Sequence, residues 1–174
     1  MESRLVFVTT FPPRECGIAT FTTDLTDAIK SQMDDSIEIE ICALEEGNQR
    51  FDYPKDVKYI LDTTQPAQYV EIAKKINKDH QVKAVMIEHE FGLFGGEYGD
   101  YLFNMLDILE KPFIITFHSV IPHPHEKMLH TVKTLADKAK NILVMTYASR
   151  EILIADYNIP EKKIKVVPHG THLV

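Results

Sequence analysis

The sequence predicts an α/β fold: an open, doubly wound and mostly parallel sheet with helices on both of its faces. Short runs rich in β-branched residues alternate with longer amphipathic runs along the 174-residue chain, which is the pattern of consecutive βα units. Several short runs, such as 113–115, are apolar without alternation, as expected for strands buried on both faces of a parallel sheet. Right-handed crossovers between such strands then produce a doubly wound sheet.

The first half of the chain contains three predicted strands and two predicted helices. The run at 5–10 is apolar and β-branched, whereas 37–44 alternates Ile and Glu before it turns apolar. Pro66 opens the second helix, at a position where its missing N–H costs nothing. The predicted elements are strands at 5–10, 37–44 and 57–61, helices at 18–33 and 66–78, and a polar loop at 45–55.

The second half repeats this alternation. Leu102, Met105 and Leu106 recur at helical spacing and predict a helix over 96–109. The other predicted helices also carry an apolar face, and the predicted strands are short and apolar. The predicted elements are strands at 82–89, 112–118, 141–146 and 164–167, and helices at 96–109, 126–139 and 148–157.

The composition excludes several functional classes. With 26 acidic and 19 basic residues the formal net charge is −7, which argues against a nucleic-acid partner. No apolar stretch reaches the roughly 18 residues of a transmembrane helix, and the N-terminus lacks the features of a signal peptide. Cys16 and Cys42 are too few for a disulfide framework. We therefore expect a reducing, cytoplasmic compartment.

Polar residues gather at the predicted carboxyl ends of five strands, which is where doubly wound sheets bind ligands. Strand ends are wetter than strand centres, and that accounts for Thr and Ser. It accounts less well for three His at equivalent positions, which indicate a shared site. The residues concerned are Thr9 and Thr10 with the loop through Arg14 to Gly17, Glu88 to Glu90, Thr116 to Ser119, Thr146 with Tyr147, and His169 with Gly170.

Three of these positions have a specific chemical interpretation. Gly17 precedes a helix, so its backbone either seats an anion at the helix N-terminus or only makes the turn. Glu88 and Glu90 share one face of a strand and His89 points to the other, so a carboxylate either serves an acceptor hydroxyl or is a solvated strand end. His118 either exchanges a proton or hydrogen bond with a ligand near pH 7, or caps the sheet through a backbone carbonyl.

Taken together, these motifs resemble the N-terminal half of a family 4 glycosyltransferase of the GT-B architecture, which has Rossmann-like domains. The resemblance runs through nearly all of the chain and rests on the order and spacing of four motifs. It implies an enzyme that transfers a hexose, with retention of configuration, from a nucleotide-diphosphate sugar to a hydroxyl of a sugar or lipid-linked acceptor. The motifs are the Gly17 turn, His89-Glu90-Phe91-Gly92-Leu93-Phe94-Gly95, Thr116-Phe117-His118-Ser119 and Val166-Val167-Pro168-His169-Gly170.

The resemblance also implies roles for individual residues. His118 matches the histidine that lies against the transferred sugar at the reaction centre, and is the expected catalytic residue. Gly17 and Ile18 match the turn whose backbone faces the donor, where Cys16 replaces the first of two glycines. The remaining expected donor-binding residues are Thr146, His169 and Gly170, and the expected acceptor-binding residues are Arg14, Glu88, His89 and Glu90.

The same resemblance predicts the domain organisation. Residues 1–168 are expected to form the acceptor-side domain, and 169–174 the start of an interdomain linker. The donor nucleotide is expected mainly on a C-terminal domain that this chain lacks, so the chain alone is expected to transfer no sugar. We expect no metal and no tightly bound cofactor, and a cytoplasmic protein that can lie peripherally on the inner face of a membrane.

Two alternatives remain open at the level of sequence. A metal-dependent hydrolase or deacetylase would draw zinc ligands from several loops, although no His-Glu-x-x-His motif is present. A non-catalytic α/β module would bind a nucleotide or a protein through the same edge of the sheet. The candidate metal ligands are His89, Glu90, His118, His123, His125 and His169.

Overall fold

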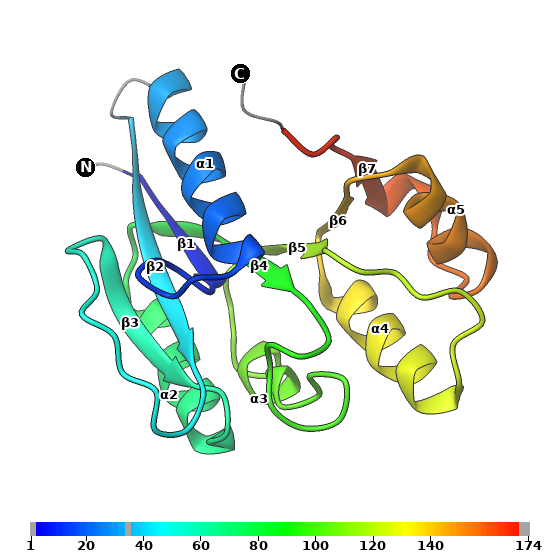
Figure 1. Cartoon of the computed structure of the whole chain (residues 1–174), viewed down its shortest axis with the longest axis horizontal. Coiled ribbons are helices and arrows are strands. Elements are labelled where there is room, and N and C mark those ends of the chain that lie inside the picture. The colour runs from blue at the N-terminus through cyan, green and yellow to red at the C-terminus, as the bar shows by residue number, and fades with distance from the viewer. Residues whose placement is uncertain (1–2, 34–35, 171–174) are drawn as a thin grey trace.

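The computed structural model describes residues 3–33 and 36–170. These described residues form one parallel sheet of seven strands with the order β3-β2-β1-β4-β5-β6-β7 (Figure 1). Every strand pair in it is parallel, which confirms the predicted fold class. The strands are β1 (Ser3–Thr9), β2 (Ile37–Glu45), β3 (Val57–Asp62), β4 (Val82–His89), β5 (Phe113–Phe117), β6 (Asn141–Val144) and β7 (Ile164–Val166).

The helices cover the two faces of the sheet unequally (Figure 1). Helix α1 packs Leu25 and Ile29 against one face, over a small cluster that includes Phe7, Ile41 and Met86. The opposite face carries the large core, to which the remaining helices contribute. The helices are α1 (Gly17–Gln32), α2 (Pro66–Lys78), α3 (Leu102–Leu106), α4 (Glu126–Lys138), α5 (Tyr147–Ala155) and the short 3₁₀ helix Glu161–Lys163.

The strand order explains this imbalance. Chain direction reverses across the sheet between β1 and β4, and β2 connects to β3 through a loop rather than a helix. Right-handed crossovers therefore place α1 alone on one face and the later helices on the other. The switch point in strand order lies between β1 and β4, at the carboxyl ends where ligands are expected.

One predicted element is wrong. The helix expected over 96–109 is reduced to the five residues of α3, and residues 96–101 form turns. Gly96 and Gly99 have φ values of 83° and 84°, and Tyr98 has a φ of 58°, conformations that an α-helix does not contain. The apolar side chains are buried without a long helix, because Phe94 and Leu102 reach the core from the loop and from α3.

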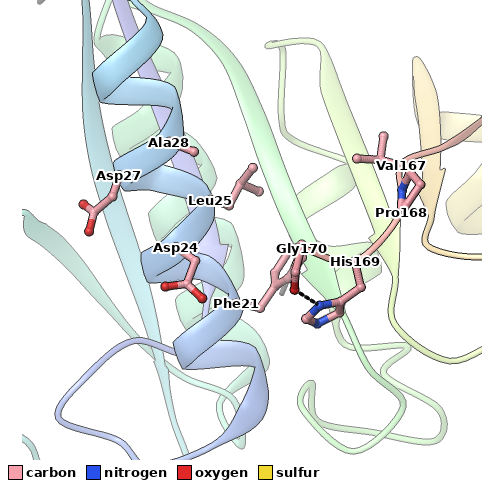
Figure 2. A pocket seen from close by; sticks show the side chains of 9 residues that line it. All are labelled: Phe21, Asp24, Leu25, Asp27, Ala28, Val167, Pro168, His169 and Gly170. Atoms are coloured by element: carbon pink, nitrogen blue, oxygen red, sulfur yellow. Dashed lines mark hydrogen bonds between the residues drawn. The ribbon is translucent and has the colours of Figure 1, made fainter. Parts of the chain in front are cut away.

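The other predicted elements agree with the structure to within one or two residues. Of the predicted linker at 169–174, residues 169 and 170 are described and the rest lie outside the described residues. Val167, Pro168, His169 and Gly170 follow β7 without regular secondary structure and lie across from α1 (Figure 2).

Candidate functional site

His118 lies just beyond the carboxyl end of β5, on the face of the sheet that α1 covers. Its backbone N–H donates to the carbonyl of His89, 3.0 Å away, so the neighbouring strand fixes its position. Thr116 precedes it by two residues and points to the same face, and Thr116 pairs in register with Glu88 of β4. The register of β4 and β5 therefore brings Glu88, Thr116 and His118 together.

Glu88 forms a close pair with His118. The Glu88 Oε2 to His118 Nε2 distance is 2.7 Å, and the Thr116 hydroxyl donates to Glu88 Oε1 over 3.3 Å. The Glu88 side chain is 0% exposed and that of His118 is 11% exposed. Glu88 therefore holds the imidazole from the buried side of the ring. Because its side chain is not exposed, it cannot make the direct acceptor contact expected from the sequence.

The N-terminal turns of α1 lie against this imidazole. Phe21 follows Gly17 by about one helical turn, and its ring meets the His118 ring edge-on with a centroid distance of 4.9 Å. The same Phe21 ring lies 5.4 Å from the ring of His169. Gly17 is exposed, and a Cβ built on it would meet no atom within 4 Å. Space for a ligand is therefore open at the end of α1 nearest to His118.

Cys16 caps α1 through its sulfur. The Sγ atom accepts from the Ala19 N–H at 3.4 Å and lies 3.1 Å from the Thr10 hydroxyl. The Cys16 carbonyl accepts from the Thr20 N–H, as the first helical hydrogen bond requires. Among the described residues, no group accepts from the N–H of Gly17 or of Ile18. Two free amides at a helix N-terminus form a favourable seat for an anion.

A cavity of about 420 Å³ opens between α1 and the chain that follows β7 (Figure 2). Phe21 stands at one end of it, beside His169, whose Nδ1 lies 2.7 Å from the Gly170 carbonyl oxygen. Phe21 thus joins His118 to this cavity, although His118 and Gly17 do not line it. Its lining residues are Phe21, Asp24, Leu25, Asp27, Ala28, Val167, Pro168, His169 and Gly170.

His89 points to the opposite face, as the strand alternation predicts, and is completely buried. The rings of Phe91, Phe94 and Phe117 surround it at centroid distances of 5.5, 5.8 and 5.3 Å. Neither ring nitrogen makes a well-formed hydrogen bond with a described residue, although the backbone of Tyr98 lies close. Burial lowers the pKa of His89 to about 4. The ring is therefore neutral near pH 7 and supports the loop after β4 from inside, with no exposed surface for an acceptor.

Glu90 is only half-buried and lies just beyond the end of β4. Its Oε1 accepts from the Phe91 N–H at 2.9 Å, and its Oε2 accepts from the Ser119 hydroxyl at 2.5 Å. Among the expected acceptor-binding residues of β4, Glu90 is the one whose side chain retains exposure. It also links the loop after β4 to the loop after β5.

Two further contacts join these loops. The Tyr98 hydroxyl lies 2.6 Å from His125 Nε2, and Lys127 Nζ lies 3.0 Å from an Asp100 carboxylate oxygen. Tyr98 has a left-handed backbone conformation with a φ of 58°, which costs free energy in a residue other than glycine. These contacts connect the loop after β4 to the loop after β5 and to the first turn of α4.

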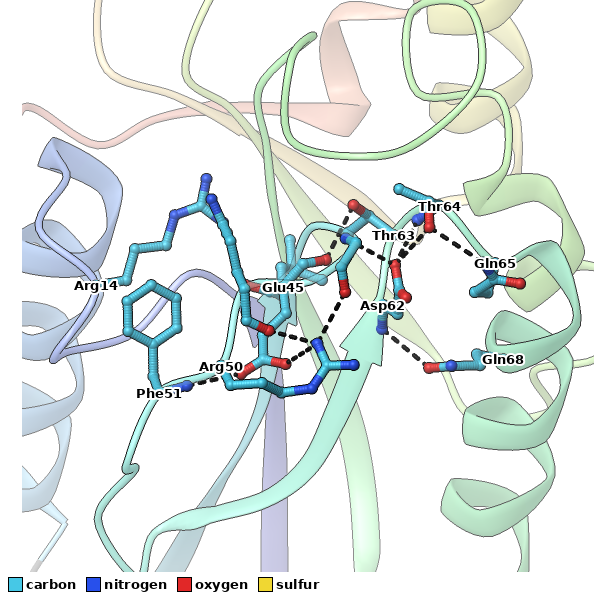
Figure 3. A network of polar contacts seen from close by, with 12 residues as sticks. Arg14, Glu45, Arg50, Phe51, Asp62, Thr63, Thr64, Gln65 and Gln68 are labelled. Atoms are coloured by element: carbon cyan, nitrogen blue, oxygen red, sulfur yellow. Dashed lines mark hydrogen bonds and ion pairs between the residues drawn. The ribbon is translucent and has the colours of Figure 1, made fainter.

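Arg14 lies over the carboxyl end of β2, beside a network of polar contacts (Figure 3). Its Nη1 donates to the Leu44 carbonyl over 3.2 Å, and its side chain is half-buried. Close by, the 1% exposed carboxylate of Glu45 pairs with Arg50 Nη1 at 3.2 Å. The arrangement holds Arg14 at the same edge of the sheet as the other predicted residues.

Asp62, at the end of β3, completes this network (Figure 3). Its Oδ1 accepts from the hydroxyl and N–H of Thr64 and from the N–H of Gly47. Partial burial raises the pKa of this carboxyl, but these hydrogen bonds outweigh it and hold the pKa below the usual value. The network ties the β2–β3 loop to the end of β3, next to the end of β2 where Arg14 binds the Leu44 carbonyl.

Thr146 acts as the N-cap of α5. Its hydroxyl oxygen accepts from the Ser149 N–H at 3.0 Å, which satisfies one of the free amides of the helix. The side chain is exposed at the carboxyl edge of the sheet, next to Tyr147, which is 70% exposed. This geometry accounts for Thr146 as a cap and leaves its expected donor contact a prediction.

The candidate metal ligands do not assemble. Within residues 3–33 and 36–170, no group of three or more His, Cys, Asp or Glu side chains could hold a metal ion. The His123 side chain is 92% exposed and lies near Asp156, whereas His125 pairs with Tyr98. The geometry gives no support to the metal-dependent hydrolase.

Sequence reasoning did not single out Phe21 or Tyr98. Phe21 could have been found, because a side chain one turn after Gly17 must lie near any ligand at that helix end. Tyr98 gave no usable signal, because its role depends on a left-handed turn inside a segment with helical spacing.

The helices in the described part of the chain are all too short or too polar to span a bilayer.

Comparison with known proteins supplies independent information. A family model described as Glycosyltransferase Family 4 matches residues 17–173. The crystal structure of a glycosyltransferase from Rickettsia africae ESF-5 has a similar fold, with a TM-score of 0.65 and 18% sequence identity. The similarity covers 97% of this chain and 43% of that one, so this chain spans less than half of its length. No curated protein matches the chain.

Proposed function

The chain belongs to glycosyltransferase family 4, and we propose from this membership that it is the acceptor-side domain of a retaining enzyme of the GT-B architecture. The enzyme would move a hexose from a nucleotide-diphosphate sugar to a hydroxyl of a sugar or lipid-linked acceptor. The observation that carries the proposal is the position of His118. It is held by buried Glu88 and lies against the N-terminal turns of α1, at the carboxyl edge of the sheet.

The end of α1 would bind the donor diphosphate. The free N–H groups of Gly17 and Ile18 and the positive end of the helix dipole attract an anion, with a dipole contribution of about 0.3–1 kcal/mol. Fixed dipoles around a departing phosphate stabilise the charge that develops as the bond to the sugar breaks. His118 would then lie beside the transferred sugar, where its imidazole hydrogen-bonds the ring near the reacting carbon.

The acceptor would approach from the side of the loops after β1 and β4. Glu90 is half-buried just beyond the end of β4, and its carboxylate would accept a hydrogen bond from an acceptor hydroxyl. Arg14 offers a cation at the same edge, held by the Leu44 carbonyl. His89 and Glu88 would serve indirectly, the first by supporting the loop and the second by supporting His118.

A second domain of the same protein would supply most of the nucleotide site. The proposal is supported by the share of the Rickettsia africae glycosyltransferase that this chain spans, 43%. It is supported also by the 420 Å³ cavity between α1 and residues 167–170, which faces away from the large core. The free thiols of Cys16 and Cys42 suit a reducing, cytoplasmic location.

The test uses the full-length protein that contains this chain. It is incubated with a panel of nucleotide-diphosphate hexoses and hydroxyl acceptors, and the anomeric configuration of each product is read by NMR. We expect transfer with retention of configuration, and no transfer by the 174-residue chain alone. An inverted product would contradict the retaining mechanism, and transfer by the chain alone would contradict the need for a second domain.

A further inference from the structure

We propose that Glu88 is a positioning residue that holds His118 as the Nε2–H tautomer, so that Nδ1 is the nitrogen offered to the donor sugar. The tautomer is a property of the protein alone, whereas contact between Nδ1 and a sugar hydroxyl rests on the proposed transferase function.

The geometry of the pair assigns the proton. Glu88 Oε2 lies 2.7 Å from His118 Nε2, which is hydrogen-bond distance. In the proposed pair Glu88 is the carboxylate, which only accepts hydrogen bonds, so the imidazole donates through Nε2. A neutral imidazole carries one ring proton, and Nδ1 is then an acceptor.

The surroundings of Glu88 favour its role as an acceptor. Its second oxygen, Oε1, accepts from the Thr116 hydroxyl, so both oxygens face donors. The carboxylate is 0% exposed, and within the described residues His118 is the only ionisable side chain that pairs with it. A buried carboxylate that loses its partner is costly, so this contact is maintained strongly.

The ring has little freedom to turn away from Glu88. The backbone N–H of His118 donates to the His89 carbonyl, and the Phe21 ring meets the imidazole at an interplanar angle of 90°. Three elements, β4, β5 and α1, thus define the plane of the ring. Orientation of a histidine by a carboxylate on its second nitrogen is a general way to set the tautomer.

Nδ1 is the nitrogen that remains available. It makes no hydrogen bond within the described residues, and it is not fully buried. A ligand hydroxyl can therefore reach it. With Nδ1 unprotonated, His118 accepts a hydrogen bond from a hydroxyl of the donor hexose, which selects a sugar that places a hydroxyl there.

The first test reads the tautomer without any substrate. In the ¹⁵N-labelled chain above pH 7, we expect the His118 ring proton on Nε2, with a resonance protected from exchange with water. In Glu88→Met that protection is lost, and in Glu88→Gln, which keeps an acceptor oxygen, it is partly restored. Glu40→Gln, a buried carboxylate beside Arg4, is the matched control and leaves the signal unchanged. A ring proton on Nδ1 in the unmodified chain would overturn the proposal, even if the variants do not fold.

The second test measures transfer by the full-length enzyme. We expect Glu88→Met to lower kcat at least about tenfold with KM for the acceptor nearly unchanged, Glu88→Gln to recover part of the loss, and Glu40→Gln to have no effect. A large loss of kcat in Glu88→Met, a smaller loss in Glu88→Gln and none in Glu40→Gln, together with the Nε2–H tautomer, support the whole proposal. Unchanged kcat in Glu88→Met overturns the sugar contact. If no hexose is transferred even by the unmodified enzyme, the proposed function fails while the tautomer result still decides the role of Glu88.

Discussion

At the scale of single residues, two neighbouring strand ends carry histidines in opposite environments. His118 faces α1 and pairs with Glu88, whereas His89 faces the large core among aromatic rings. His89 of β4 pairs in register with Phe117 of β5, so both point to the same face. His118 is the next residue after Phe117, and successive strand residues point to opposite faces. His118 therefore keeps partial exposure at the carboxyl edge of the sheet, whereas His89 is fully enclosed by the core.

The burial of His89 predicts a pH-dependent stability. Its pKa is lowered to about 4, below the unfolded value near 6.5, so between these values only the unfolded chain takes up the proton. Protonation of His89 in the unfolded chain therefore leaves the free energy of unfolding unchanged above about pH 6.5. Between pH 6.5 and about 4 it lowers that free energy by on the order of 3 kcal/mol. Urea unfolding across this range should show a shallower pH dependence for His89→Leu.

The control for this prediction is His80→Gln, which changes an exposed histidine. We expect it to keep the pH dependence of the unmodified chain. The comparison uses the slope of the unfolding free energy against pH, so a loss of absolute stability in His89→Leu does not affect it. An unchanged slope in His89→Leu would show that this imidazole does not resist protonation in the folded state.

Several site residues were predictable, and their environments were not. The sequence places Glu88, His118 and Gly17 at the carboxyl edge, because strand ends and helix starts can be located from patterning. It does not tell that Glu88 is buried beneath His118, because that contact depends on the register between β4 and β5, two strands separated by a crossover. Side-chain burial at a strand end is a property of the tertiary structure.

At the scale of elements, hydrogen bonds tie the loop after β4 to the loop after β3 and to α2. Gly95 donates its N–H to the Tyr69 hydroxyl, and the Tyr69 hydroxyl donates to the Thr63 carbonyl. Its conformation was not predictable, because the apolar spacing of 102, 105 and 106 fits a helix over 96–109 equally well. Gly96 and Gly99 adopt left-handed conformations that end this possibility.

Gly95→Ala should destabilise this loop. The added Cβ would lie 2.0 Å from the Thr63 carbonyl oxygen and 2.6 Å from the Tyr101 ring, so the backbone must shift. We expect a loss of about 1–3 kcal/mol in the free energy of unfolding, measured by urea denaturation. Gly92→Ala is the matched control, because its Cβ would meet nothing within 4 Å. Equal stability of the two variants would contradict the close approach of Gly95 to Thr63.

Thr146 provides a second prediction for an element, the start of α5. Thr146→Ala removes the hydroxyl that accepts from the Ser149 N–H and should cost about 1 kcal/mol of stability. Thr146→Ser keeps the cap and should unfold with nearly the same free energy as the unmodified chain. If thermal and urea unfolding are unaffected in Thr146→Ala while KM for the donor rises, Thr146 is a donor ligand and not a cap.

At the scale of the whole molecule, the sheet has one thickly covered face and one face covered by α1 alone. This imbalance follows from the strand order and from the helix-free connection between β2 and β3. The parallel sheet was predictable because its strands are short, apolar and separated by helices. The groove between α1 and residues 167–170 was not, because it depends on where the chain runs after its last strand.

The measurement that tests the account most directly is the turnover of the full-length enzyme with His118→Ala. If His118 lies against the transferred sugar, kcat should fall at least about tenfold, while His80→Ala, at an exposed position away from the site, should leave kcat unchanged. Turnover in His118→Ala equal to that of the unmodified enzyme would remove His118 from the site. It would also remove the reason for assigning the carboxyl edge beside α1 to sugar transfer.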